Sequence, residues 1–312
     1  MSNNPGTSNG DPQRWSRVWS IGIYAGTSPL ALAPATANPV LTAKHVTDCD
    51  AYYVADPFMI HWDGAWYMYF EVLLRASRRG VIGMAQSADA IHWEYRRLVL
   101  QESFHLAYPQ VFSWEGAVYM IPETLGANAI RLYQAASFPD RFEPAADLIE
   151  GPWADPTIFR YQERWWLLAC STPYQNRTLH LFFADELSGP WHSHPQNPIV
   201  ADDRRIARPG GRVRCVDHHL IRFAQDCVPR YGSRLRALEI LELAPDCFRE
   251  KELAQSPVLL PQESGWNSVG MHHMDAHCLG DRWWIASVDG DQLTPDPVEP
   301  LQESPVSSTS RQ

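Results

Sequence analysis

Acidic side chains recur at similar intervals along this 312-residue chain, and their types suit acid–base chemistry. Asp56 and Asp155 each stand in an Asp-Pro pair before an aromatic run, and Glu71 and Glu123 each close the second half of such a run. Cleavage of a glycosidic bond needs two carboxyl groups, one that holds a proton and one that is ionised. Asp56 is a candidate for activating a water, and the candidate acids are Glu123, which we favour, Glu71 and Asp226.

A basic segment offers a different kind of site. Residues 204–214 contain five Arg, and Gly210-Gly211 would let the backbone approach a ligand closely. Such a segment is typical of a pocket rim that binds phosphate, sulfate or carboxylate. The alternative is a solvated loop neutralised by Asp202 and Asp203, and both interpretations remain open.

A third cluster is the sequence MHHMDAH, residues 271–277. On a strand, alternation places His273, Asp275 and His277 on one face and His272 on the other. The chain has no HExxH motif, and none of its six Cys forms a CxxC pair, so we assign no catalytic metal. We expect the thiols to be reduced.

Internal repetition predicts the elements that hold these residues. Residues 56–71, 108–123 and 155–170 align without gaps, and weaker copies cover 208–226 and 272–289. Each copy is an aromatic run, a polar turn and a second run, which indicates a β-hairpin. Two further strand-like runs follow each of the first three hairpins, so four strands recur about every 50 residues, a pattern typical of propeller blades. The sequence thus predicts an all-β fold, a single five-bladed β-propeller of four-stranded antiparallel blades.

The last repeat lacks outer strands, and residues 15–41 contain strand-like runs that could supply them. We therefore predict that the N-terminal segment closes the ring, which removes exposed sheet edges. The predicted propeller covers residues 15–291. Polar tails at 1–14 and 292–312 are predicted to be disordered.

The innermost strands of a propeller surround its axis, so equivalent repeat positions face one another. The alignment predicts that Asp56, Tyr108, Asp155, Arg208 and His273 line one end of the central channel. The alternative is that turn preferences alone put polar residues at strand starts.

Further side chains are predicted near this end. Glu71 and Glu123 belong to the same end of their hairpins, where each either takes part in chemistry or makes a structural hydrogen bond to a neighbouring blade. We also name His272 and Asp226 as substrate-binding candidates, and Trp153 as a sugar-stacking platform.

Bulk composition excludes several functions. A formal charge of −10 argues against nucleic acid as the main partner. No run of about 18 apolar residues is present, so no membrane span is expected. The polar start is not a signal peptide, and we expect a cytoplasmic protein. The sequence gives no indication of oligomeric state.

Specific motifs add a family resemblance. The blade starts ADPFMIHWDGAWYMYF and ADPTIFRYQERWWLLA, with the later AQSADAIHW and FADELSGPW, resemble glycoside hydrolase family 43 and its five-bladed relatives. The motifs YPQVF, MIPE, ARPGG and AQD are most similar to a group that includes the propeller region of glucosamine inositolphosphorylceramide transferases.

The resemblance implies roles for individual residues. Asp56 matches the base of family 43 and Asp155 matches its orienting carboxylate. The Glu that acts as acid in that family is missing, because this chain has Arg208 at the start of the fourth blade, and Arg cannot donate a proton near neutral pH. Related propellers also imply a structural Ca²⁺ on the axis near His273, with no other cofactor required.

Two functions follow. The first is a glycoside hydrolase-like enzyme that cleaves or transfers a glycosidic bond of a sugar or glycoconjugate, an anionic one if Arg208 contacts it. The second is a non-catalytic carbohydrate-binding propeller that serves a biosynthetic pathway.

Overall fold

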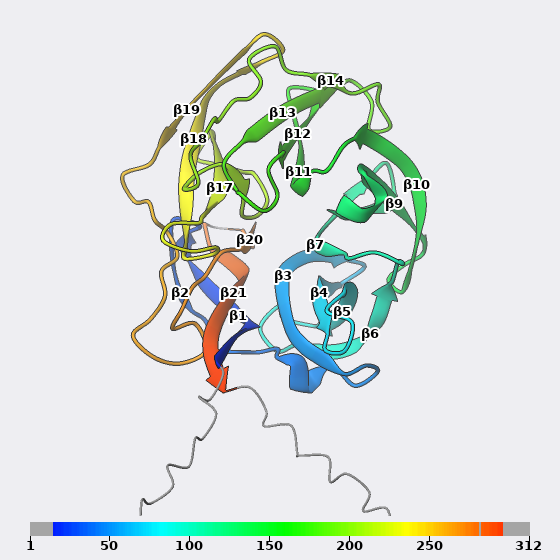
Figure 1. The fold of residues 1–312 in the computed structure, drawn as a ribbon, viewed down its shortest axis with the longest axis vertical. Coiled ribbons are helices and arrows are strands. Elements are labelled where there is room, and N and C mark those ends of the chain that lie inside the picture. Colours follow the sequence, from blue (N-terminus) through cyan, green and yellow to red (C-terminus); the bar gives the residue numbers. More distant parts are fainter. Residues whose placement is uncertain (1–14, 281, 296–312) are drawn as a thin grey trace, which may run out of the picture.

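The computed structural model describes residues 15–280 and 282–295, and it confirms the five-bladed all-β propeller. Figure 1 shows the five sheets arranged around a common axis. The first two blades are regular four-stranded antiparallel sheets. Their strands are β3 (Ala51–Trp62), β4 (Ala65–Leu74), β5 (Gly80–Ser87) and β6 (Glu94–Leu100), then β7 (Ala107–Trp114), β8 (Ala117–Glu123), β9 (Ala129–Ser137) and β10 (Arg141–Glu150).

The third and fourth blades follow the same plan with one interruption. The third contains β11 (Ala154–Tyr161), β12 (Arg164–Cys170), β13 (Leu179–Ala184) and β14 (His192–Ser193). In the fourth, the innermost strand is split into β15 (Arg208–Pro209) and β16 (Arg214–Val216), and both pieces pair with β17 (His219–Asp226). Its outer strands are β18 (Arg234–Ala244) and β19 (Cys247–Glu252).

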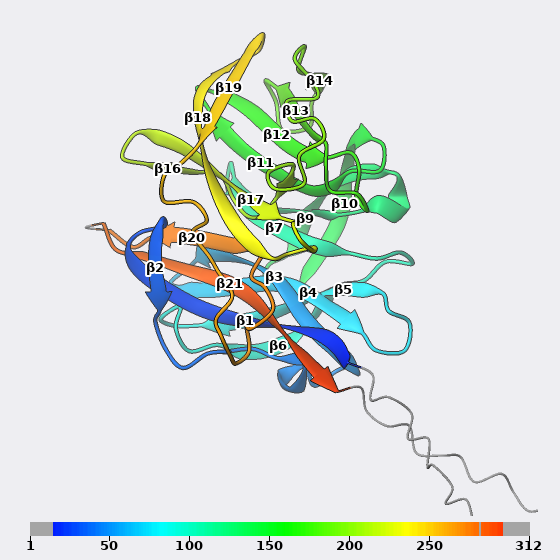
Figure 2. The same ribbon diagram turned by 60° about the vertical axis from the view of Figure 1, so that its left-hand side comes forward.

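The fifth blade joins the two ends of the described chain, as predicted. Its order is β20 (Met274–Cys278), β21 (Trp284–Pro295), β1 (Trp15–Ser28) and β2 (Ala31–Pro34). β1 and β21 run side by side and pair from Trp15↔Pro295 to Gly26↔Trp284 (Figure 2). The ladder carries β21 past the predicted boundary at 291, because residues 292–295 find partners on β1. The predicted tail 1–14, and residues 296–312 of the predicted tail 292–312, lie outside the described residues.

The first three inner strands share one irregularity at the axis. Asp56, Tyr108 and Asp155 all adopt positive φ values, of 53°, 51° and 48°. The hairpin register slips at each of them, between Ala55 and Phe58 in the first blade. A left-handed backbone is unfavourable for these residue types and marks a bulge that redirects a side chain. The repeated Asp-Pro or Tyr-Pro pair is therefore the sequence signal of this bulge.

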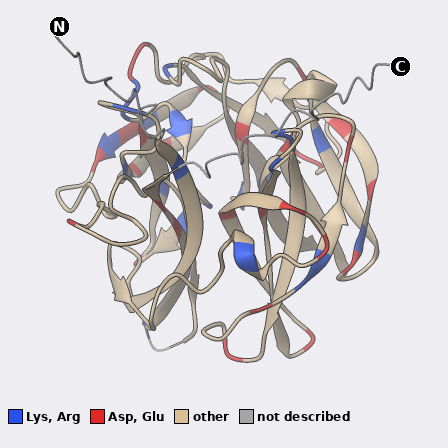
Figure 3. Ribbon diagram, turned by 60° about the horizontal axis from the view of Figure 1, so that its bottom comes forward, with Lys and Arg blue, Asp and Glu red and all other residues tan. Residues whose placement is uncertain are grey.

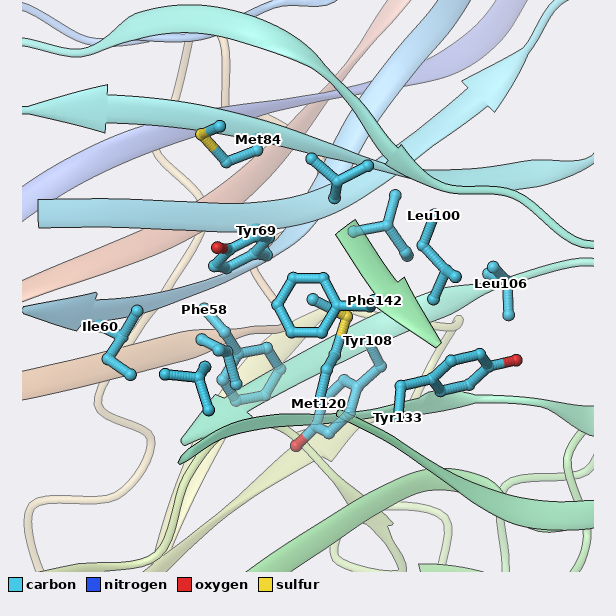
Figure 4. Packing of buried hydrophobic residues seen from close by; sticks show 14 of the residues in the cluster. Phe58, Ile60, Tyr69, Met84, Leu100, Leu106, Tyr108, Met120, Tyr133 and Phe142 are labelled. Atoms are coloured by element: carbon cyan, nitrogen blue, oxygen red, sulfur yellow. The ribbon is translucent and has the colours of Figure 1, made fainter. Parts of the chain in front are cut away.

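Apolar side chains from facing sheets fill the space between neighbouring blades. Figure 4 shows the cluster between the first two blades, where Phe58, Tyr69 and Tyr108 pack with Met120 and Phe142. Phe58 meets the edge of the Tyr108 ring with centroids 4.8 Å apart. Alternation along β3 and β7 aims these rings between the sheets and fixes the inner strands that carry the polar residues.

Asp275 of β20 is the centre of a second group of ion pairs, separate from Asp56. Arg212 Nε donates to Asp275 Oδ1 at 2.9 Å, and Arg214 reaches the same oxygen at 3.2 Å. Asp275 also accepts from the backbone N–H of Met59, and His277 lies 2.9 Å from it. Two of the five Arg of residues 204–214 are thus structural, and the segment is not a single anion-binding rim.

Gly210 and Gly211 lie tightly against neighbouring parts of the protein. A Cβ at Gly211 would lie 1.9 Å from the Met274 carbonyl oxygen, and the φ of Gly211 is +136°.

We expect Gly211→Ala to destabilise the fold by about 1–3 kcal/mol or more, the usual cost of overpacking. Thermal unfolding would measure this. Gly116→Ala is the control, because Gly116 also has positive φ (+79°) but has nothing within 4 Å of its Cβ position. Equal losses would show that the collision is unimportant.

Charged residues of both signs are spread over the blades in Figure 3. No helix in the described part of the chain is long and apolar enough to cross a membrane.

Candidate functional site

Four carboxyl groups from three blades gather at one end of the axis. Asp56, Glu71, Glu123 and Asp155 are each at most 5% exposed. Asp155 and Glu123 are joined by Arg208, and the charges of Asp155 and Glu71 both act on Asp56. The structure therefore brings together the carboxyl groups that the repeat alignment placed at this end.

Arg208 is fully engaged by the protein. Its Nε and Nη2 hold the two oxygens of Asp155 at 2.6 and 3.2 Å, and Nη2 also contacts Glu123 at 3.2 Å. Its Nη1 donates to the Pro173 carbonyl at 2.7 Å and to Asn176 Oδ1 at 2.9 Å. A guanidinium has five N–H groups, and these contacts use all of them. Arg208 therefore orients the carboxylates and has no donor left for an anionic ligand.

Glu123 and Glu71 are proton-holding groups. Burial, followed by the charge of Asp155, raises the pKa of Glu123 to about 8, even though Arg208 opposes the shift. Burial and the charge of Glu123 likewise raise the pKa of Glu71 to about 8. Glu123 Oε2 also accepts from the backbone N–H of Asp155, at 3.2 Å, in the next blade. Both interpretations of Glu123, structural hydrogen bond and proton donor, are thus compatible with its geometry.

Asp56 stands beside a second buried acid, Asp289. Asp289 Oδ2 accepts the backbone N–H of Asp56, and Asp289 Oδ1 accepts the backbone N–H groups of His272 and His273. Burial and then the charge of Asp289 raise the pKa of Asp56 well above its usual range. Burial also disfavours ionised Asp289, but the charges of His272 and His273 and these hydrogen bonds lower its pKa overall. These opposite pKa shifts favour a protonated Asp56 beside an ionised Asp289.

His272 connects this pair to the loop that follows β17. Its Nδ1 lies 2.7 Å from Asp289 Oδ1, and its Nε2 lies 3.1 Å from the Tyr231 hydroxyl and 3.5 Å from Asp56 Oδ1. The ring stacks on Trp19 of β1, with centroids 4.0 Å apart. Ring closure by β1 therefore also completes the site.

A pocket of about 310 Å³ opens onto this cluster, a volume in the range of small-molecule sites. Tyr231 and the exposed Tyr174 provide aromatic walls, and Arg208 lies over the Tyr231 ring at 5.1 Å. The lining is a mixture of apolar and polar groups, namely Glu123, Leu125, Pro173, Tyr174, Asn176, Arg208 and Tyr231. Of the four carboxyl groups, Glu123 lines the pocket, and Asp56, Glu71 and Asp155 lie behind the lining residues. Glu71 contacts the Tyr53 hydroxyl and His105, each at 3.4 Å.

Tyr108 and His273 contact each other and are not part of the pocket lining. Their rings meet edge to face at 5.3 Å, and the Tyr108 hydroxyl contacts Thr157 and the backbone N–H of Gly211. His273 donates from Nε2 to the Pro57 carbonyl at 3.0 Å, and burial lowers its pKa to about 4. Both side chains support the inner strands, and neither lines the pocket.

Two other sequence candidates lie away from the cluster. Asp226 is buried but pairs with Arg234 and Arg236, because alternation along β17 points it away from Asp155. The neighbouring Gln225 faces Asp155 in its place, at 2.5 Å. Trp153 packs against His180 and Phe182 in the third blade and is absent from the pocket lining.

The surroundings of His273 do not fit the expected calcium ion. Its ring is enclosed by Phe58 and Tyr108, whereas Ca²⁺ takes six to eight oxygen ligands. Asp56, His272 and Asp289 form the group of described residues with donor atoms close enough for a cation, within 4.8 Å. Two of these donors, His272 Nδ1 and Asp289 Oδ1, already bond to each other.

Sequence reasoning missed several residues of this site. Tyr231, Asn176 and Pro173 lie in loops, where no repeat position marks them. Asp289 was detectable in principle, because it belongs to a second strand of a blade, as Glu71 and Glu123 do.

Comparison with known proteins places this geometry in context. The family model of the glucosamine inositolphosphorylceramide transferase 1 N-terminal region matches residues 15–291. Proteins of that name from rice (Oryza sativa subsp. japonica) and Arabidopsis thaliana are 34% and 32% identical over 303 and 299 residues. Each alignment covers 88% of this chain but only 40% and 39% of the relative, so the chain spans about two fifths of their length.

Solved structures share the fold at low sequence identity. An exo-1,5-α-L-arabinanase from a bovine ruminal metagenomic library aligns with a TM-score of 0.57 at 14% identity, over 78% of this chain and 94% of that one. A GH43_1 enzyme from Xanthomonas citri gives 0.57 at 13%, over 83% and 88%. An α-L-arabinanase from Cellvibrio cellulosa gives 0.54 at 15%, over 78% and 93%.

Proposed function

The chain belongs to the family of the N-terminal region of glucosamine inositolphosphorylceramide transferase 1, and we propose that its axial pocket binds a sugar or glycoconjugate and cleaves or transfers a glycosidic bond. The name of the relatives, glucosamine inositolphosphorylceramide transferase 1, supports a carbohydrate ligand. The fold shared with arabinanases is compatible with it.

The observation that carries the proposal is the excess of buried carboxyl groups beside the pocket. Arg208 pairs with Glu123 and Asp155, and its charge also acts on Asp56, whereas Glu71 has only His105 beside it among its ion-pair partners in the described structure. Asp56 Oδ1 is buried without a hydrogen-bond partner among the described residues. Burying carboxyl groups without full compensation costs stability. Shifted pKa values grouped in a pocket are typical of catalytic sites.

In this proposal each group has a role that its position supports. Glu123 lines the pocket with its proton in place, so it can protonate the leaving oxygen as the bond to the anomeric carbon breaks. Asp56, once ionised, takes the proton of the attacking water or acceptor hydroxyl. Asp155 does not react: it fixes Arg208, which in turn holds Glu123. Glu123 thereby replaces the fourth-blade acid that the resemblance leads one to expect.

A second function, sugar binding without chemistry, is favoured by the same Arg208. It occupies the position of the family 43 acid and ties down two carboxylates. A screen of aryl furanosides, aryl pyranosides and phosphorylated or uronic sugars, followed for both turnover and heat of binding, separates the two. Saturable binding without product would establish the binding function.

Glu123→Gln tests the acid. We expect turnover of glycosides with poor leaving groups to fall about 10²–10⁴-fold, the usual contribution of general acid–base catalysis. Activated aryl glycosides should lose much less, because their leaving groups need little protonation. The wild-type rate should fall as the pH rises through about 8, where Glu123 loses its proton, and this limb should disappear in the variant.

Glu143→Gln is the matched control. Glu143 lies on the outermost strand of the same blade, with its side chain 62% exposed, so the same chemical substitution is made outside the pocket lining. Equal losses for both leaving-group classes in Glu123→Gln would contradict its role as acid.

A further inference from the structure

A hydrogen-bonded chain of side chains that the proposed function does not use ends at Tyr231, which lines the pocket. Asp289 Oδ1 accepts from His272 Nδ1 at 2.7 Å. When the imidazole is neutral, its Nε2 is then the acceptor for the Tyr231 hydroxyl at 3.1 Å. Tyr231 also lines the pocket, as Glu123 does. A hydroxyl, a base within hydrogen-bond reach and a carboxylate that orients the base form the arrangement that activates a nucleophile.

The surrounding structure holds this chain rigidly. Asp289 accepts four hydrogen bonds, one from the His272 ring and three from the backbone N–H groups of Asp56, His272 and His273. The Trp19 ring stacks on the His272 ring, with centroids 4.0 Å apart. Such support keeps Asp289 ionised and fixes both the tautomer and the plane of the imidazole.

A glycine lets Tyr231 reach the histidine. Gly232 has φ +67°, and a Cβ there would lie 2.9 Å from Trp19 and 3.1 Å from His272 Cβ. The tight approach of this loop to His272 therefore requires glycine immediately after Tyr231. Arg208 lies over the Tyr231 ring at 5.1 Å, where its charge favours a developing phenolate.

Resting on the proposed function, we infer that Tyr231 is the nucleophile and that the reaction passes through a glycosyl–tyrosine intermediate. In the first step the Tyr231 oxygen bonds to the anomeric carbon, and its proton moves to His272 Nε2. The bond to the leaving oxygen breaks, and that oxygen receives the proton of Glu123.

The second step releases the sugar. Between the two steps, solvent carries the proton of Asp56 to Glu123, which the first step left ionised. Water or an acceptor hydroxyl then attacks the anomeric carbon, and its proton goes to the ionised Asp56. The bond to Tyr231 breaks, and the phenolate recovers its proton from His272, so that every group regains its starting protonation state. Two displacements give net retention of anomeric configuration, and the covalent intermediate allows transfer to an acceptor other than water.

Burial explains why a relay is needed. It raises the pKa of Tyr231 well above its usual range, although Arg208 opposes the shift, so the resting phenol keeps its proton. Activation must therefore occur by transfer to His272 during attack, as for other hydroxyl nucleophiles.

The first experiment looks for the intermediate. Asp56→Asn protein, which lacks the base of the second step, is mixed with an activated aryl glycoside found in the screen, and the product is digested and analysed by mass spectrometry. We expect one glycosyl unit on the peptide that contains Tyr231, absent in the double variant with Tyr231→Phe. Tyr119→Phe is the control, because Tyr119 stacks on Phe112 away from the pocket.

The second experiment needs no variant. Proton NMR of the first product released by the wild-type protein should show retained anomeric configuration. Tyr231→Phe should reduce turnover at least about 10²–10⁴-fold, and His272→Gln by about that range, the contribution of a general base. Asp289→Asn, a change in a positioning residue, should alter the pH profile as well as the rate.

The outcomes separate the two proposals. Inverted product with no adduct would overturn the tyrosine nucleophile and leave the proposed function standing. An adduct on another residue would also overturn it. Saturable sugar binding with no turnover of any glycoside would overturn both the nucleophile and the enzyme.

Discussion

Arg208→Met is expected to destabilise the protein by about 3–5 kcal/mol, the usual result of removing one partner from a buried ion pair. The Arg208 side chain is 10% exposed, and those of Asp155 and Glu123 are 2% and 6% exposed. Without the guanidinium, both carboxyl groups would remain buried with no cation beside them. Chemical denaturation at pH 7 would measure the loss.

The loss of stability in Arg208→Met should be larger at high pH than at low pH. The folded-state pKa of Glu123 is about 8, above the unfolded value of about 4.3. A raised pKa means that its stability contribution is fully present below about pH 4.3 and is lost as the pH rises through about 8. Removal of Arg208 raises this pKa further, so the variant should lose most at high pH and recover at low pH.

Arg141→Met is the matched control for this variant. Arg141 pairs with Glu143, and their side chains are 66% and 62% exposed. An exposed pair contributes about 0–1 kcal/mol, so this change should be nearly neutral. An Arg208→Met protein as stable as the Arg141→Met protein would show that Arg208 is not the element that holds the carboxylates.

Asp56→Asn should separate activity from stability. We expect turnover to fall about 10²–10⁴-fold, because asparagine cannot take the proton of the acceptor. Stability should be unchanged or higher, because burial already favours the neutral side chain and Oδ1 has no hydrogen bond to lose. A site that gains stability when its reactive group is removed is typical of a functional site.

Steady-state rates and unfolding midpoints measured on one preparation would test this pair of effects. Full activity in Asp56→Asn would remove Asp56 from the mechanism. Lost activity with an equally large loss of stability would instead make Asp56 a structural residue.

Closure of the ring connects the fold to the site. Trp19 comes from β1, His272 and Asp289 from the last repeat, and Tyr231 from the fourth blade. The β1–β21 ladder that completes the fifth blade thus also places Trp19 against His272.

The sequence by itself determined the propeller and the positions of its axial carboxyl groups. Strand alternation and turn residues act over a few positions, so the hairpin repeat could be recognised without a structure. Asp56, Asp155, Glu71 and Glu123 could be placed at one end because each repeats at a fixed position within a blade.

Only the tertiary structure decided what surrounds them. Asn176 and Tyr231 reach the site from loops, and the spacing of loop residues carries no repeat. The partners of Arg208 could not be inferred from its position, because the same guanidinium would bind an anion if Asp155 and Glu123 were not already within reach. Side-chain contacts between residues 53 and 85 positions apart depend on how the blades close around the axis, and local sequence does not encode that distance.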